Sequence, residues 1–276
     1  MRLAISNIAW DVAEDEQVSQ LLIRYGIDAI DIAPGKYFPD LANTSDQHIN
    51  HIRTWWAERG IELTGMQGLL FGTHGLNVFG SVEVRNVMLK HFAALYRIAA
   101  GLGITRLVFG SPKNRDRRGL SDYETLEIAV LFFRQLGDLA QSNGVTLCLE
   151  PNPSCYGANF MTTSAETASV VKYIDHPAIK MQLDTGALTI NREKVQEVLA
   201  SNAKLIGHIH ASEPDLLPLG DGITDHKEVY TALQAYLPEH LVCIEMLATK
   251  EESHLLAIER ALRIAKQSYQ PAAGVN

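Results

Sequence analysis

Residues 144–150 read GVTLCLE, a glycine followed by an apolar run that ends in a glutamate. Glycine suits the left-handed backbone position that ends a helix, and the apolar residues after it are typical of a strand buried on both faces. The same junction of a glycine with a β-branched residue recurs at Gly26-Ile27, Gly60-Ile61 and Gly103-Ile104. This repeat predicts a chain built from units of helix, turn and parallel strand.

The pattern predicts eight strands, separated by segments with helical periodicity. They lie at residues 3–6, 28–32, 63–67, 106–110, 145–150, 179–184, 205–210 and 241–245. Ser121 with Glu124 and Thr163 with Glu166 each fit a capping box, which marks a helix start. Eight units of about 34 residues fit a closed barrel better than an open sheet. We therefore predict an α/β fold, a single-domain (β/α)₈ TIM barrel.

The barrel is expected over residues 1–269, with a disordered tail over residues 270–276. A doubly wound sheet is the alternative, but it calls for a glycine-rich phosphate-binding turn after the first strand. The sequence SNIAWD stands at that place, over residues 6–11. The barrel is therefore the preferred interpretation.

Composition limits the function classes. The chain has 276 residues, 46% of them hydrophobic, and a formal net charge of −8, which disfavours broad binding to nucleic acid. Three cysteines without framework spacing, and no apolar run near the roughly 20 residues that cross a bilayer, predict a cytoplasmic protein without a membrane partner. The chain contains one basic cluster, formed by Lys113, Arg115, Arg117 and Arg118. We interpret it either as a solvated loop or as a contact to a substrate anion.

The last four predicted strands all end in ionisable residues, namely Glu150, Asp184, His210 and Glu245. Alternation along a strand places these side chains in the barrel mouth, while their apolar neighbours pack outward against helices. Reactive groups of a parallel barrel lie where its strands end. Each residue alone could be a helix cap or an ion-pair partner, but four ends with the same parity predict one common site.

Three converging carboxylates repel one another unless a cation or a proton lies among them. Three carboxylates and one imidazole form an oxygen-rich set that suits one divalent ion, with Mn²⁺ or Mg²⁺ first and Co²⁺ or Zn²⁺ as alternatives. Cys148 and Cys243 share the inward parity but lie two residues deeper, so we interpret them as buried apolar side chains rather than thiolate ligands.

At these residues the chain resembles the xylose isomerase-like TIM barrel superfamily, and within it the sugar phosphate isomerase/epimerase branch. The resemblance spans nearly the whole chain. Four motifs carry it together: LCLEPNP around Glu150, MQLDTG around Asp184, GHIHASE around His210 and VCIEM around Glu245.

The resemblance implies a metal-dependent isomerase or epimerase of a sugar, sugar phosphate or related ketone. In that branch the residues matching Glu150 and Glu245 bind the metal and also move the proton beside the substrate carbonyl. A metal-dependent dehydratase of a keto-polyol of the inosose type uses the same residues and is the alternative. An apurinic-site endonuclease fits the acidic charge poorly, and a sugar-binding barrel without catalysis is the remaining interpretation.

The chain departs from the ketose 3-epimerase pattern at two positions. Members often carry a histidine where this chain has Ala187, and an arginine in the loop after the seventh strand, where Leu216 stands nearby. Both residues help to hold substrate oxygens in those relatives. We expect Glu213 or His208 to substitute, and His208 also fits a partner of His210 one layer deeper or a hydrogen-bonded core histidine.

Other rim residues are candidates for contact with a sugar. The loop over residues 152–163, which contains Tyr156 and Asn159, is expected to act as a lid. Relatives of this kind often pair, so a homodimer is expected. The predicted substrate contacts are Trp10, Asp31, Gln67, His74, Tyr156, His208 and Glu213.

Overall fold

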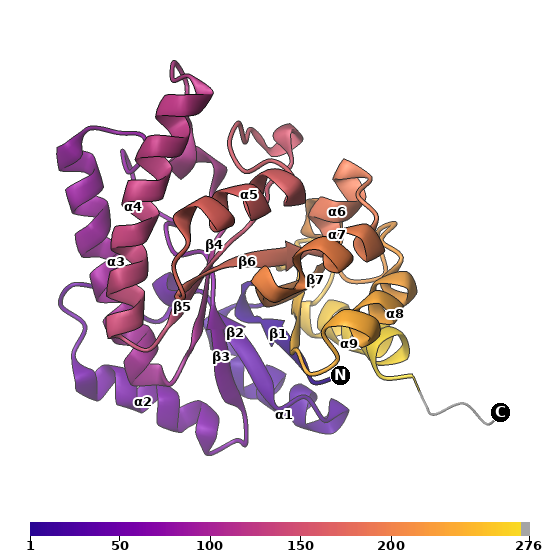
Figure 1. The fold of residues 1–276 in the computed structure, drawn as a ribbon. Helices are drawn as coiled ribbons and strands as arrows, with labels where there is room; N and C mark the ends of the chain where they lie inside the picture. Colours follow the sequence, from indigo (N-terminus) through magenta and orange to yellow (C-terminus); the bar gives the residue numbers. More distant parts are fainter. Residues whose placement is uncertain (272–276) are drawn as a thin grey trace.

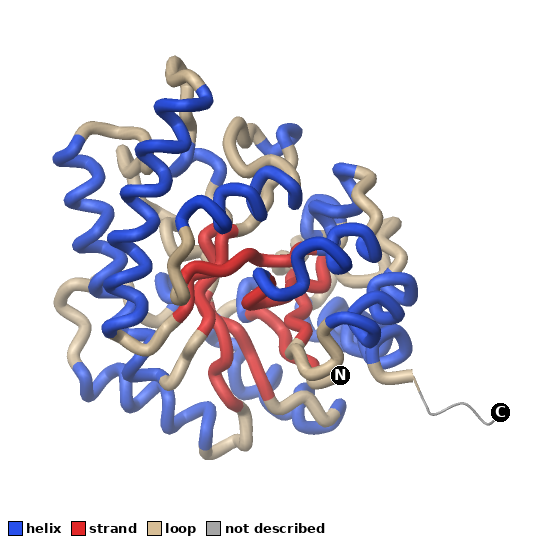
Figure 2. Tube along the Cα trace, viewed as in Figure 1, coloured by secondary structure: helices blue, strands red, loops and turns tan. Residues whose placement is uncertain are grey.

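The computed structural model describes residues 1–271 and shows a closed barrel of eight parallel strands in sequence order, with β8 paired to β1. Figure 2 shows the strands as an inner wall with helices around it. The predicted single-domain (β/α)₈ barrel is confirmed. The strands are β1 Leu3–Ser6, β2 Ala29–Ile32, β3 Glu62–Met66, β4 Arg106–Phe109, β5 Thr146–Leu149, β6 Ile179–Asp184, β7 Ile206–Ser212 and β8 Val242–Glu245.

The helices alternate with the strands and cover the outside of the barrel (Figure 1). The connection between β6 and β7 differs from the others because it contains two short helices, α6 and α7. The α-helices are α1 Asp15–Tyr25, α2 Asp46–Ala57, α3 Val82–Leu102, α4 Asp122–Ser142, α5 Ser164–Ile174, α6 Thr185–Asn191, α7 Val195–Asn202, α8 His226–Tyr236 and α9 His254–Tyr269.

The helix ends follow the predicted chemistry in part. Gly26 and Gly103 end α1 and α3 at positive φ values of 67° and 82°, the conformation that glycine adopts without strain. The capping box of Ser121 and Glu124 is complete. At α5 only half of it forms, because the Glu166 carboxylate accepts its hydrogen bonds from Thr162 instead of Thr163.

Alternation along the strands divides the interior into two regions. Outward-facing side chains such as Leu149 and Leu183 join a large apolar core between barrel and helices. Cys243 packs with Ala4 and Ala29 in a separate small cluster. Cys148 is also buried, and burial raises the pKa of its thiol to about 12. This burial supports the interpretation of both cysteines as apolar side chains.

The C-terminal end of the described residues is hydrogen-bonded to the N-terminal residue. The Gln270 side-chain amide donates a hydrogen bond to the Met1 carbonyl oxygen at 2.6 Å. The tail predicted over residues 270–276 therefore begins with an ordered residue, and residues 272–276 lie outside the described part. Among the described helices, none combines the length and the apolar character needed to cross a bilayer.

Candidate metal centre

Four buried ionisable side chains meet where β5, β6, β7 and β8 end. Glu150 directly follows β5, Asp184 ends β6, His210 lies in β7 and Glu245 ends β8. One donor atom from each residue lies within 4.8 Å of the donor atoms of the other three. The structure thus brings together the four residues predicted from the strand ends, and this group could hold a metal ion.

The orientation of His210 is set by its carboxylate neighbours. Its Nδ1 atom lies 3.1 Å from Glu245 Oε2 and 3.5 Å from Glu150 Oε1. Its other ring nitrogen, Nε2, faces Asp31 in the barrel interior. Nδ1 is therefore the ring atom available to a cation among the carboxylates.

The centre carries more negative than positive charge. Burial, together with the neighbouring Glu150 and Glu245, raises the pKa of Asp184 above its usual range. Burial disfavours the charged form of His210, but Glu245 and Glu150 outweigh it and raise the pKa of the imidazole. Three carboxylates against one imidazole leave excess negative charge, and Glu150 Oε1 has no hydrogen-bond donor among residues 1–271. An oxygen-rich, negatively charged set of this kind fits a hard divalent cation.

Asp184 is held by two hydrogen bonds that the sequence motif did not reveal. Ser212 Oγ donates to Asp184 Oδ2 at 2.7 Å, and the Ala187 amide donates to Oδ1 at 2.6 Å. The second bond makes Asp184 the N-cap of α6. The helix-cap interpretation and the common-site interpretation are therefore both correct for this residue. Ser212 has the inward parity of His210, which was the only signal for it in the sequence.

The two glutamates each accept a hydrogen bond from a side-chain amide. Gln67 Nε2 donates to Glu245 Oε1 at 2.5 Å, and Asn152 Nδ2 donates to Glu150 Oε2 at 3.1 Å. Gln67 was predicted as a substrate contact and lies beside the centre. Asn152 lies in the LCLEPNP motif but was not singled out. These amides orient the carboxylates and leave their remaining oxygen lone pairs toward the centre.

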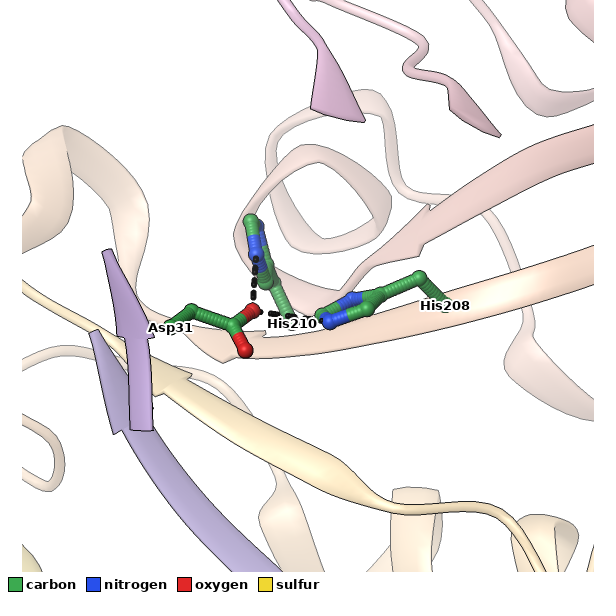
Figure 3. Close-up of side chains that lie close together, drawn as sticks. All are labelled: Asp31, His208 and His210. Atoms are coloured by element: carbon green, nitrogen blue, oxygen red, sulfur yellow. Dashed lines mark ion pairs between the residues drawn. The ribbon is translucent and has the colours of Figure 1, made fainter. Parts of the chain in front are cut away.

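A second polar layer lies directly below the centre, where Asp31 from β2 approaches both histidines of β7 (Figure 3). Asp31 Oδ2 lies 2.8 Å from His208 Nε2 and 3.9 Å from His210 Nε2. The Asp31 carboxylate also accepts a hydrogen bond from Thr64 Oγ1 at 2.9 Å. His208 is thus placed one layer below His210, as predicted. Asp31 is fully buried here, a position that does not support its predicted contact with substrate hydroxyls.

Two further residues that were predicted to contact the substrate interact with other parts of the protein instead. Trp10 is buried, and its Nε1 donates to Asp15 Oδ1 at 2.7 Å, so its one polar atom already has a partner within the protein. Glu213 is also buried, where it accepts hydrogen bonds from the Gly220 and Thr224 amides and pairs with His226. With its oxygens occupied, Glu213 does not take the place of the missing loop arginine.

The last two predicted contacts lie on exposed loops. The Tyr156 hydroxyl accepts a hydrogen bond from the Asp215 amide at 2.7 Å, which joins the loop after β5 to the loop after β7. His74 is exposed on the loop after β3 and belongs to none of the three groups of acids and histidines found among the described residues. Tyr156 therefore has a structural link to the rim that His74 lacks.

The fold and the centre define the class of protein: a (β/α)₈ barrel whose last four strands present three carboxylates and a histidine at one rim. The chain belongs to the xylose isomerase-like TIM barrel family, because the model of that family matches residues 20–267. Family membership agrees with the motifs around all four residues of the centre.

Individual relatives are similar over different lengths. A D-psicose 3-epimerase of Ruminiclostridium cellulolyticum is 27% identical over 121 residues, which cover 44% of this chain and 39% of that relative. The structure of D-psicose 3-epimerase with D-tagatose from Clostridium cellulolyticum H10 superposes with a TM-score of 0.82 at 20% identity, covering 98% of this chain and 99% of that one. The IOLI protein with a bound zinc atom gives a TM-score of 0.76 at 16% identity, covering 99% and 100%. The structural likenesses extend the shared barrel to almost the whole chain.

Proposed function

We propose that this protein is a divalent-metal-dependent isomerase or epimerase of a sugar, a sugar phosphate or a related ketone. The observation that carries the proposal is the pair of buried glutamates, Glu150 and Glu245, which both approach His210 Nδ1 at the barrel mouth. Two carboxylates at one centre provide a base that removes a proton and an acid that returns it. That pair supports proton transfer at a carbon beside a carbonyl.

The group expected to bind the cation consists of Glu150, Asp184, His210 and Glu245. A divalent ion held there would supply positive charge to offset the negative charge that develops on substrate oxygens during proton removal. Because three of the four donors are carboxylates, we propose Mn²⁺ or Mg²⁺ first. Co²⁺ and Zn²⁺ are the alternatives, and the IOLI relative holds zinc.

The proton chemistry is assigned to the two glutamates. One carboxylate takes the proton from the carbon beside the substrate carbonyl, and the electron pair of that C–H bond forms the enediolate. Return of a proton to the opposite face of the same carbon inverts it, while return to the neighbouring carbon isomerises the sugar. Gln67 and Asn152 keep the two carboxylates oriented through their hydrogen bonds.

The relatives support the reaction class more strongly than a particular substrate. The D-psicose 3-epimerase to which the chain is similar in sequence and in structure is named for a ketose, and a substrate of that kind is our first candidate. This chain has Ala187 where that branch often has a histidine, and the loop after β7 has no arginine. Glu213 does not replace them, because its carboxylate accepts hydrogen bonds from the Gly220 and Thr224 amides. We therefore propose the class of reaction, with a cytoplasmic homodimer as the expected form of the protein.

Solvent exchange tests the proposal directly. Protein loaded with Mn²⁺ is incubated in D₂O with a panel of ketoses, phosphoketoses and inososes, and the products are analysed by mass spectrometry and NMR. Deuterium at the carbon beside the carbonyl is the expected result for the wild type, with Glu150→Gln losing exchange in one epimer and Glu245→Gln losing it in the other. Loss of water from the substrate would assign the dehydratase instead. A protein that binds metal and sugar without any exchange would be a binding barrel, and the proposal would be wrong.

A further inference from the structure

Arg115 is a fully buried cation in the loop after β4. The basic cluster to which it belongs was interpreted as a solvated loop or as a contact to a substrate anion, and for Arg115 the first interpretation is wrong. Its neighbour Arg118 is largely exposed, and Arg117 pairs with Asp122. Burial lowers the pKa of Arg115 to about 10, which still leaves the guanidinium charged at neutral pH. Burial of a charge costs several kcal/mol unless other groups compensate for it.

The direct partner of this cation is the main chain of Glu150. Arg115 Nη1 donates to the Glu150 carbonyl oxygen at 2.7 Å. The Glu150 amide in turn donates to the Phe109 carbonyl oxygen at 3.1 Å. Both main-chain polar groups of Glu150 are therefore bonded to β4 or the loop that follows it. The other two carboxylates of the centre are held differently, by Ser212 and Gln67.

Two further donors of Arg115, Nε and Nη2, have no hydrogen-bond partner among residues 1–271. Buried donors of a structural residue are normally satisfied, and leaving two unsatisfied costs folding free energy. The carboxylates of Glu150 and Glu166 lie near enough to favour the charged guanidinium. What this arrangement provides is a fixed positive charge and a fixed main-chain contact at Glu150.

Hydrogen bonds on both sides of Arg115 set its position. The Val78 amide donates to the Asn114 carbonyl oxygen at 2.8 Å, which ties the loop after β3 to the residue before Arg115. Asn159 Nδ2 donates to Asp116 Oδ1 at 2.7 Å, which ties the loop after β5 to the residue after it. The loops after β3 and β5 thus hold the residues on either side of Arg115 in the loop after β4.

We propose that Arg115 is a positioning residue that fixes Glu150, and not Glu245, for proton transfer. The inference rests on the proposed function, in which the two glutamates serve opposite faces of the substrate. A proton that leaves carbon for Glu150 exchanges with solvent and returns as deuterium, with the C–H electron pair held in the enediolate meanwhile. Displacement of Glu150 therefore slows deuterium exchange in the epimer that Glu150 deprotonates. Exchange in the other epimer, which Glu245 deprotonates, continues.

The test measures deuterium incorporation in D₂O separately from each of the two epimers that the wild type interconverts. Glu150→Gln identifies the epimer served by Glu150. Arg115→Met is expected to slow exchange of that epimer roughly 10- to 100-fold more than exchange of the other, the size of effect that misplacement of a catalytic group produces. Arg115→Lys, which keeps the charge, is expected to retain part of the rate. Arg118→Met is the matched control from the same loop and should behave as wild type.

A second readout needs no substrate. The electron paramagnetic resonance spectrum of bound Mn²⁺ in Arg115→Met should change in the same direction as in Glu150→Gln, and Arg118→Met should leave it unchanged. If Arg115→Met does not fold, Arg115→Lys and Arg115→Gln carry both measurements.

Equal slowing of both epimers would show that Arg115 supports the rim in general, and the inference would be overturned. Wild-type exchange and an unchanged spectrum in Arg115→Met would overturn it as well. Absence of exchange in the wild type would refute the proposed function, while the Mn²⁺ spectrum would still decide whether Arg115 fixes Glu150.

Discussion

The Glu150 carboxylate occupies the space beside Gly110 that a side chain would otherwise fill. A β-carbon at Gly110 would lie 1.9 Å from Glu150 Oε2, far inside van der Waals contact. Gly110 follows β4, so the neighbouring strand leaves a gap into which the glutamate folds. The geometry of Glu150 therefore depends on a residue that carries no functional group.

Gly110→Ala is expected to displace Glu150 from the centre while the barrel still folds. Solvent exchange should fall about 100-fold, because a displacement of about 1 Å at a catalytic group costs that much. Thermal unfolding and the deuterium assay together measure both effects. Gly35→Ala is the control, since a β-carbon there meets nothing within 4 Å. Wild-type exchange in Gly110→Ala would contradict this account of the gap.

Glu150→Gln and Glu245→Gln keep the shape of each side chain but remove the base. Each change should lower the rate of deuterium incorporation into the epimer that the residue deprotonates about 100- to 10,000-fold, the usual contribution of general acid–base catalysis. Glu197→Gln, an exposed residue paired with Lys194, is the matched control. Retention of wild-type exchange by either variant would remove that glutamate from the proton-transfer mechanism.

Asp31→Asn tests the layer below the centre. The change removes the carboxylate that faces His208 and His210, and such partners orient metal-binding histidines. We expect the affinity for Mn²⁺, measured by isothermal titration calorimetry, to fall about 10- to 100-fold. Asp28→Asn, at an exposed pair with Arg2, should leave the affinity unchanged. If both variants bind Mn²⁺ as the wild type does, Asp31 has no role in orienting His210.

Metal binding should stabilise the fold through the four-residue centre. An ion at 100 times its dissociation constant adds about 2.7 kcal/mol to the free energy of unfolding. We expect Mn²⁺ to raise the melting temperature of chelator-treated protein, and Asp184→Asn to abolish most of that rise. A separate group of possible metal ligands lies nearer the surface and consists of Asp11, Glu14 and His254. Glu14→Gln alters that group and should preserve the rise in melting temperature. The opposite pattern would place the ion at the surface group.

Glu213 should make part of the stability dependent on pH. Burial opposes its ionisation, but His226 and the Thr224 and Gly220 amides outweigh burial and lower the pKa to about 2. Since the folded pKa lies below the unfolded value of 4.5, the contribution is complete above that pH and disappears as pH falls toward 2.

Urea unfolding of wild type and Glu213→Gln measures this contribution. At pH 7 the variant should be less stable by at most roughly 3 kcal/mol, the energy equivalent of the pKa shift before solvent screening reduces it. The difference should shrink steadily between about pH 4.5 and pH 2. A difference that is constant over this range would assign the effect of the variant to lost packing instead of charge.

The sequence by itself determined the architecture and the four residues of the centre. Glycine at helix ends followed by an apolar run is a local signal that occurs at four junctions, and apolar runs between helical segments complete the eight predicted strands. Strand parity then places Glu150, Asp184, His210 and Glu245 on the inside, because a side chain's face is fixed by its position along the strand.

Only the tertiary structure decided which polar side chains remain available at the rim. Asp31, Trp10 and Glu213 had the right positions for substrate contact, yet each is buried against partners that are distant in sequence or lie across a loop. The burial of Arg115 within a run of basic residues is the clearest case. Its local sequence is that of a solvated loop, and its burial depends on loops from three neighbouring strands. Such contacts depend on chain segments far apart in sequence, so local pattern does not encode them.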